Sequence, residues 1–290
     1  MKPFLALAFV GLFTVLLRAE PLPVGKSSIE VEVGEKLELF TYKPANYAGG
    51  PLLLVFHGVG RNADEYRDFA VTLGDRFGFL VVAPKFDRDR FPLDRYQRGG
   101  ILKDGLLQPR ESWTYAMVPR IVEAVRQLEG KPALPFWIIG HSAGGQFVVR
   151  MVAMVGTLGA SGVVAANPGS HLFPTRDQPF GYGFGALPPE LSDDAALRRY
   201  VEAPLMLFLG TADTDPNHRS LDREPEAMKQ GASRYERGLA CFAAAETLAR
   251  ERGWSFGWRK VEAPGIEHDA AKMFAAPEVE EALFGRAAGK

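Results

Sequence analysis

A serine in the middle of the chain has the neighbours that a protein nucleophile requires. Residues 140–144 read GHSAG; they follow an apolar run at 135–139 and precede a helical pattern at 145–155. Small residues beside the serine permit a tight turn between a strand and a helix, which exposes the hydroxyl. The N-terminus of the helix favours the negative charge of acyl transfer. These patterns favour Ser142 as a nucleophile over a merely structural glycine-rich turn.

A serine hydroxyl needs a base, and three histidines follow it in the chain. His171 lies early, in a loop rich in proline and glycine, and would reverse the chain order of serine, acid and base that this turn predicts. His218 lies in a polar string, DPNHRS, which is typical of a solvated loop. His268 follows the last apolar run, in a loop that enters a C-terminal helix. We therefore expect His268 to be the base, the alternative being a loop histidine beside a helix cap.

The acid that orients the base is expected after the strand at 204–209. Asp213 follows the glycine that ends this run, at a distance from which a carboxylate can reach an imidazole over the sheet edge. Asp215 is the rival, although it could instead form an Asx-turn with the chain that follows. The sequence favours Asp213. Other downstream acids lie in polar stretches and are expected at the surface: Asp193, Asp194 and Asp222.

An oxyanion hole is expected from two backbone N–H groups. The strand at 52–56 is followed by HGVGRN, and the N–H of Val59 in this loop is the first expected donor. The N–H of Ala143, after the nucleophile, is the second. Gly60 would allow a turn with positive φ. We interpret His57 as a side chain that braces the loop.

These residues need a scaffold, and short apolar runs alternate with longer helical patterns along the chain, as in a parallel α/β sheet. Helices are expected at 64–78, 113–128, 145–155, 232–252 and 277–284. Strands are expected at 29–33, 36–42, 52–56, 79–83, 135–139, 162–166, 204–209 and 255–261, the first two as an edge hairpin.

Two long connections, 84–112 and 168–187, leave strand ends at the carboxyl edge of the sheet, where α/β sheets bind ligands. They carry or border eight aromatic residues, which favour a substrate rim or cap over plain surface loops: Phe86, Phe91, Tyr96, Trp113, Phe173, Phe180, Tyr182 and Phe184.

The motifs FHGVG, GHSAG, GTAD and IEHD together resemble those of the α/β-hydrolase superfamily, over about residues 29–284. Within it, they are similar to those of secreted esterases grouped with polyhydroxybutyrate depolymerases and feruloyl esterases. The resemblance implies a mostly parallel sheet of about eight strands with helices on both faces. It also implies cleavage of carboxylic esters through an acyl-enzyme, without a cofactor. By motif, Ser142 matches the nucleophile, Asp213 the acid, His268 the base, and Val59 and Ala143 the oxyanion donors.

Composition limits the remaining function classes. The 290 residues carry 34 Lys+Arg and 35 Asp+Glu, a formal net charge of −1, which argues against a nucleic-acid binder. Cys241 is the only cysteine, so an intramolecular disulfide and a cysteine zinc cluster are excluded. No His/Asp/Glu set has the spacing of metal ligands, and we expect no metal and no cofactor.

The N-terminus predicts export. Lys2 precedes an apolar stretch that ends before Arg18-Ala19, the pattern of a signal peptide over residues 1–19. The apolar stretch is short for a membrane span, which needs roughly 20 residues. We expect a periplasmic or secreted catalytic domain at 20–290 that is not stably inserted in a membrane, the alternative being an uncleaved N-terminal anchor.

Three alternatives to an esterase remain open at this point: a serine peptidase on the same fold, an acyltransferase with the same triad, and a non-catalytic binding module. The first two share the expected residues, and the third is disfavoured by a serine, an acid and a histidine in the right order. The expected partner is a small or polymeric ester.

Overall fold

The computed structural model describes residues 20–285. The predicted signal peptide, residues 1–19, lies outside the described residues. One sheet has the strand order β1-β2-β4-β3-β7-β8-β9-β10, and a separate hairpin pairs β5 with β6. The strands of the main sheet are β1 Gly25–Glu32, β2 Lys36–Lys43, β3 Leu52–Phe56, β4 Leu80–Pro84, β7 Phe136–His141, β8 Gly162–Ala166, β9 Met206–Gly210 and β10 Arg259–Ala263. The hairpin strands are β5 Leu102–Lys103 and β6 Leu106–Leu107.

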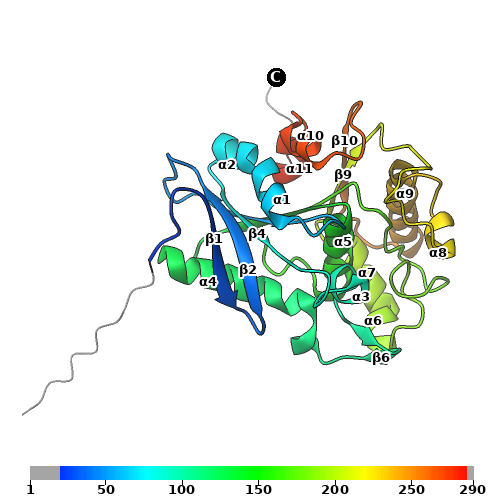
Figure 1. Cartoon of the computed structure of the whole chain (residues 1–290). Helices are drawn as coiled ribbons and strands as arrows, with labels where there is room; N and C mark the ends of the chain where they lie inside the picture. The colour runs from blue at the N-terminus through cyan, green and yellow to red at the C-terminus, as the bar shows by residue number, and fades with distance from the viewer. Residues whose placement is uncertain (1–19, 286–290) are drawn as a thin grey trace, which may run out of the picture.

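The sheet is mostly parallel, which confirms the predicted fold class. Only β1 with β2 and β2 with β4 pair antiparallel, and β4 to β10 pair parallel across the rest of the sheet. In Figure 1 the blue hairpin of β1 and β2 lies at one side of the molecule, far from β9 and β10. The chain runs outward from β3 to β4 and then returns to β7 on the other side of β3. This reversal opens a crevice at the carboxyl ends of β3 and β7.

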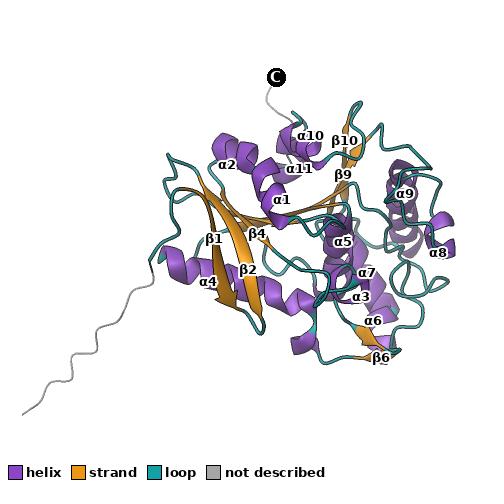
Figure 2. Ribbon diagram, in the orientation of Figure 1, coloured by secondary structure: helices purple, strands orange, loops and turns teal. Residues whose placement is uncertain are grey.

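Helices cover both faces of the sheet (Figure 2). The longer ones are α1 Ala63–Phe69, α2 Val71–Phe77, α4 Met117–Glu129, α5 Ala143–Val155, α7 Asp194–Glu202, α9 Arg234–Arg252, α10 Ala270–Ala275 and α11 Val279–Phe284. The helices of one turn are α3 Leu93–Tyr96, α6 Pro189–Ser192 and α8 Pro225–Met228, and 3₁₀ turns span Arg110–Ser112 and Thr114–Ala116.

Two hydrophobic cores sandwich the sheet because alternate strand residues point to opposite faces. In β3, Leu54 and Phe56 belong to the core beneath α4, α5 and α9, whereas Leu53 and Val55 belong to the core beneath α1, α2, α10 and α11. All five residues of β3 are buried. Burial on both faces explains why the central strands read as continuous apolar runs.

The boundaries of several elements differ from the sequence prediction. The helix expected at 64–78 is two helices, α1 and α2, that meet at Ala70. The strand expected at 255–261 begins only at Arg259. The residues before it bond elsewhere: Gly257 N donates to Val201 O at 2.8 Å and Trp258 Nε1 donates to Tyr200 O at 2.8 Å. This stretch therefore packs against α7, a helix that the sequence analysis missed.

Candidate active site

Ser142 occupies a strained turn between β7 and α5. Its φ is 58° and its ψ is −115°, a left-handed conformation that costs on the order of 1–3 kcal/mol outside glycine. The surrounding backbone holds it there, because Ser142 N donates to Ala166 O at 3.0 Å and Gln146 N donates to Ser142 O at 3.0 Å. The hydroxyl is thereby fixed at the carboxyl edge of the sheet, where the crevice opens.

The glycines beside Ser142 are required by close approach of the chains. A Cβ on Gly144 would lie 2.0 Å from Phe56 O, and a Cβ on Gly140 would lie 2.3 Å from Gly144 O. Both contacts are to backbone atoms, which cannot move aside like the end of a side chain. The turn can therefore pack against β3 only with glycine at these positions.

The structure brings the three expected side chains into one hydrogen-bonded line. His268 Nε2 lies 2.9 Å from Ser142 Oγ, and His268 Nδ1 lies 2.7 Å from Asp213 Oδ2. Ser142 follows β7, Asp213 lies in the loop after β9, and His268 lies in the loop after β10. Parallel neighbouring strands end at one edge, so the sheet itself assembles the group from distant segments. The geometry allows Nε2 of the imidazole to accept the serine proton while the carboxylate forms a hydrogen bond with Nδ1.

Asp215, the rival acid, lies in the same loop but is not the hydrogen-bond partner of His268, which is Asp213. Asp215 is exposed, and its Oδ1 accepts a hydrogen bond from Asn217 N at 2.8 Å. This is the Asx-turn considered as its alternative role.

A residue that the sequence analysis missed contacts the other oxygen of Asp213. Arg234 Nη1 donates to Asp213 Oδ1 at 3.2 Å, with side-chain exposures of 1% and 4%. Arg234 comes from the start of α9, and no motif near it signals a role beside the acid. Only the tertiary packing of α9 against the loop after β9 brings the two side chains together.

The electrostatic environment favours a neutral His268. Burial lowers its pKa below the ordinary 6.5; the hydrogen bond to Asp213 raises the pKa, and the charge on Arg234 lowers it again. A neutral imidazole is the form that can accept a proton from serine.

Two further histidines flank His268. His218 lies in a loop, as expected, and is half-buried there because its ring packs against that of His268, with centroids 5.3 Å apart. The ring of His141 lies 4.7 Å from His268, and its Nδ1 is 3.0 Å from the hydroxyl of Tyr66. Burial lowers the pKa of His141 well below 6.5, so it stays neutral beside His268.

The loop after β3 carries Val59, the expected oxyanion donor, and lies beside Ser142. Val59 and Ala143 line the same pocket as Ser142. The left-handed residue of this loop is Arg61, with φ 62°, and the expectation of positive φ at Gly60 is wrong. A hydrogen bond from the Arg61 side chain offsets the cost of this backbone conformation, because Nη1 donates to Phe86 O at 3.1 Å. His57 braces the loop as expected: its Nε2 accepts from Phe86 N at 3.0 Å.

The sequence matches no family model and none of the curated proteins. Solved structures do match. The chain is 36% identical to poly(aspartic acid) hydrolase-1 from Sphingomonas sp. KT-1, with a TM-score of 0.81 over 87% of this chain and 96% of that one. It is 32% identical to LpqC, a poly(3-hydroxybutyrate) depolymerase from Bordetella parapertussis, with a TM-score of 0.83 over 92% of this chain and 93% of that one. The chain belongs to the α/β-hydrolase family.

More distant α/β-hydrolase neighbours share the fold alone. An S-formylglutathione hydrolase from Agrobacterium tumefaciens is 19% identical, with a TM-score of 0.50 over 89% of this chain and 94% of that one. The two relatives above 30% identity confirm the resemblance to depolymerase-like hydrolases.

A cavity of about 710 Å³ opens beside the serine of this α/β-hydrolase. Its floor includes Ser142 and Ala143, and its walls come from the loop after β3, from α3 and from the connection after β8. The wall also carries four carboxylates and one guanidinium: Asp94, Asp222, Glu224, Glu226 and Arg98. Arg98 Nη1 pairs with Asp94 at 2.9 Å, so the remaining lining is acidic.

Most of the aromatic residues expected at a substrate rim are core residues instead. Phe86, Phe91 and Tyr96 have no exposed surface, and Trp113 is 1% exposed. They pack around Phe147 and β3 in the core beneath α5. The long connections hold these rings inward because burying an aromatic ring stabilises the loop. Of the eight, Phe180 and Tyr182 reach the cavity beside Ser142.

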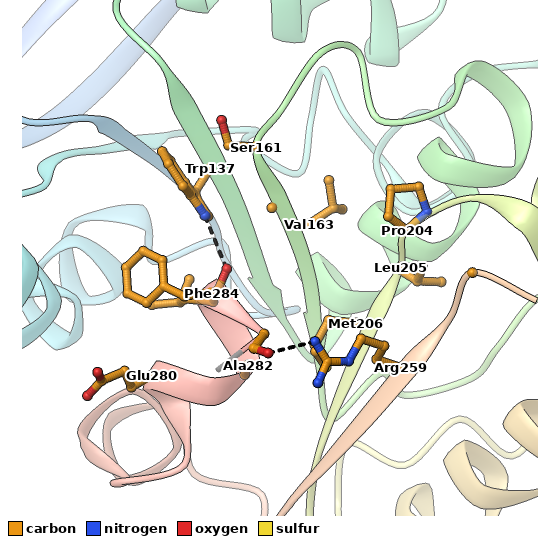
Figure 3. Close-up of a pocket in the computed structure, with 14 residues that line it drawn as sticks. Trp137, Ser161, Val163, Pro204, Leu205, Met206, Arg259, Glu280, Ala282 and Phe284 are labelled. Carbon is orange, nitrogen blue, oxygen red and sulfur yellow. Dashed lines mark hydrogen bonds between the residues drawn. The ribbon is translucent and has the colours of Figure 1, made fainter. Parts of the chain in front are cut away.

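A second cavity, of about 600 Å³, lies at the opposite edge of the sheet (Figure 3). It is lined by the beginnings of β8 and β9 and by the end of α11. Trp137 Nε1 donates to Leu283 O at 3.1 Å and Arg259 Nη1 donates to Gly285 O at 2.8 Å, which ties α11 to the sheet. None of the hydrogen-bonded triad borders this cavity, so it takes no part in the chemistry described here.

Proposed function

We propose that this α/β-hydrolase is a serine hydrolase that cleaves carboxylic esters through an acyl-enzyme. The observation that supports it is the line from Ser142 Oγ through His268 to Asp213, with distances of 2.9 and 2.7 Å. His268 takes the serine proton as Oγ attacks the ester carbonyl. Asp213 holds the imidazole tautomer and stabilises the imidazolium. His268 then protonates the leaving alkoxide, and water repeats the cycle to release the acid.

The tetrahedral intermediate carries its charge on the former carbonyl oxygen. The N–H groups of Val59 and Ala143 are the proposed donors to this oxygen. Ala143 begins α5, so its N–H is one of the groups at the helix N-terminus that have no partner within the helix. The partial positive charge of that helix end adds to the stabilisation.

The charge of the cavity wall favours a neutral ester. Asp222, Glu224 and Glu226 lie in one segment, and the guanidinium of Arg98 is already paired with Asp94. Arg237, buried behind this wall, donates to the carbonyl oxygen of Asp222 at 2.8 Å and offsets part of the charge. A polyanion would still meet like charges on entering, which weakens its binding.

A second candidate is hydrolysis of an acidic polyamide, because the relative that is 36% identical is a poly(aspartic acid) hydrolase. The same triad can attack an amide. The acidic wall argues against this candidate, and a direct comparison of substrates decides between the two.

The test begins with a fluorophosphonate probe, which labels an activated serine. The folded protein should be labelled, and Ser142→Ala should abolish labelling and nearly all turnover. Ser161→Ala, at the opposite edge of the sheet, should leave both unchanged. Folded wild-type protein that takes no label would instead support a binding module.

The substrate is then sought with p-nitrophenyl esters of rising acyl length, a feruloyl ester, a polyester film and poly(aspartic acid). Turnover of the neutral esters and none of the polyanion is the expected result. Faster cleavage of poly(aspartic acid) would replace this proposal with the second candidate. Acyl transfer to an added alcohol in place of hydrolysis would identify an acyltransferase.

We also propose that the protein is exported, with residues 1–19 as a cleaved signal and 20–290 as one catalytic domain. Within residues 20–285, no helix is both long and apolar enough to span a bilayer. N-terminal sequencing of the protein recovered from the periplasm or medium tests cleavage. An intact N-terminus in the membrane fraction would favour the uncleaved anchor.

A further inference from the structure

Arg234 joins the acid of the triad to the start of the longest helix. It is the first residue of α9, and a capping box between Ser233 and Glu236 fixes this helix end. Tyr235 N also donates to Asp213 O at 3.2 Å, so the loop that carries the acid is attached to α9 through backbone and side chain. The position of the Asp213 carboxylate is therefore set by α9 as well as by β9.

The guanidinium of Arg234 has two sets of contacts. Nη1 donates to Asp213 Oδ1 at 3.2 Å, and Nη2 donates to Ser220 Oγ at 2.9 Å. Nη2 also lies 3.1 Å from Nδ1 of His218. A guanidinium can only donate, so Nδ1 of His218 must be an acceptor without a proton. Ser220 N, at 3.3 Å from the same nitrogen, requires the same state.

Charged and titratable groups from several elements surround His268. The loop after β9 supplies Asp213, and the start of α9 supplies Arg234. Of the other ring neighbours, His218 is neutral by the contacts described above, and burial keeps His141 neutral. The remaining neighbours are acids on its own loop and across it: Asp269, which pairs with Lys272 at 3.6 Å, Glu267 and the exposed Asp215.

Within the part of the chain that the structure describes, Arg234 is the one permanent cation that contacts Asp213. We propose that Arg234 is a positioning residue for the triad: it fixes the Asp213 carboxylate and, as a fixed positive charge on that carboxylate, keeps His268 unprotonated at mildly acidic pH. The inference rests on the proposed function, in which His268 acts as the base.

The physical consequence is a compromise between two needs of the base. An unpaired Asp213 would stabilise the imidazolium more strongly, and His268 would therefore stay protonated up to a higher pH. The positive charge of Arg234 offsets part of the negative charge of Asp213, and solvent screens this interaction little because the site is buried. Removing the guanidinium should raise the pKa of His268 and move the acid limb of kcat/KM upward by about one pH unit.

The experiment compares Arg234→Met, Arg234→Lys and wild type from pH 4.5 to 8, with p-nitrophenyl butyrate followed at the isosbestic wavelength of the released nitrophenol. Arg234→Met should move the acid limb to higher pH. Arg234→Lys keeps the charge and should restore the limb, although the loss of the contacts from Nη2 to Ser220 and His218 lowers kcat. The control, Arg250→Met, removes an exposed arginine from the same helix and should leave the profile unchanged.

A lower kcat in Arg234→Met with an unmoved acid limb would overturn the proposal, because it would show a purely structural role. Histidine NMR gives a second reading that needs no substrate. The titration midpoint of His268 should lie below about 6.5 in the wild-type protein and rise in Arg234→Met. If that variant does not fold, a wild-type midpoint at or above 6.5 overturns the proposal. Failure of ester hydrolysis itself would show separately, as absent labelling of Ser142.

Discussion

Replacing Asp213 with asparagine should disable the base by giving it the wrong tautomer. Arg234 presents donors to Oδ1 of Asp213, and His268 presents Nδ1 to Oδ2. An asparagine has only one acceptor oxygen, and the buried cation will take it. The amide NH₂ then faces Nδ1 of His268 and requires that nitrogen to accept. The proton moves to Nε2, which can no longer accept the proton of Ser142.

The size of the effect follows from two terms. An aspartate-to-asparagine change in a comparable triad lowers kcat about 10⁴-fold, which corresponds to about 5.4 kcal/mol of transition-state stabilisation. The change also leaves Arg234 without its carboxylate, with both side chains at most 4% exposed. Breaking a buried ion pair in this way costs about 3–5 kcal/mol of unfolding free energy. Asp213→Asn should therefore be nearly inactive and less stable.

The matched control is Asp215→Asn. Asp215 is exposed and accepts from Asn217 N, and an asparagine oxygen can keep that turn. We expect kcat within about twofold of wild type and unchanged stability. The assay measures kcat with p-nitrophenyl butyrate and stability by urea unfolding, with circular dichroism to verify the fold. Loss of activity in Asp215→Asn with near-normal Asp213→Asn would refute the reasoning.

Two further predictions concern the scaffold of the site. Gly144→Ala places a Cβ 2.0 Å from Phe56 O and should lower the free energy of urea unfolding by more than about 2 kcal/mol. In the control, Gly60→Ala, the Cβ meets only the end of the Asn62 side chain at 3.0 Å, and the loss should be less than about 1 kcal/mol. Equal losses in the two variants would contradict the packing argument. Burial lowers the pKa of His57 to about 4, so the unfolded chain binds the proton first as pH falls below about 6.5. The contribution of His57 to the unfolding free energy should therefore fall by up to about 1.4 kcal/mol per pH unit down to pH 4. His57→Gln should flatten this slope between pH 6.5 and 4.5, and parallel slopes would show that His57 contributes nothing.

The sequence predicts best those features that depend on local geometry. The GHSAG turn can be recognised in the sequence because the strand, the serine and the helix that form it are adjacent in the chain. The apolar runs of the central strands follow from burial on both faces of the sheet. His268 and Asp213 were located by their place after strands, and the structure brings both to Ser142.

Features that depend on packing between distant segments escaped prediction. Arg234 lies among ordinary helical residues, and its role arises only where α9 meets the loop after β9. The aromatic rings of the long connections are predicted at a substrate rim, yet most of them are core residues, because both environments use the same residue types. The positive φ of Arg61 has no local signal, since its side chain is held by Phe86 and by the ring of Tyr96 across the loop.

The topology of the sheet predicts that the active site assembles late in folding. His268 is separated from Ser142 by 126 positions and from Asp213 by 55, and its loop is placed by the pairing of β10 with β9. Closing such long segments is slow compared with forming local helices. In a refolding reaction, catalytic turnover should thus count only molecules whose final strand has docked, and helical signal should recover before it.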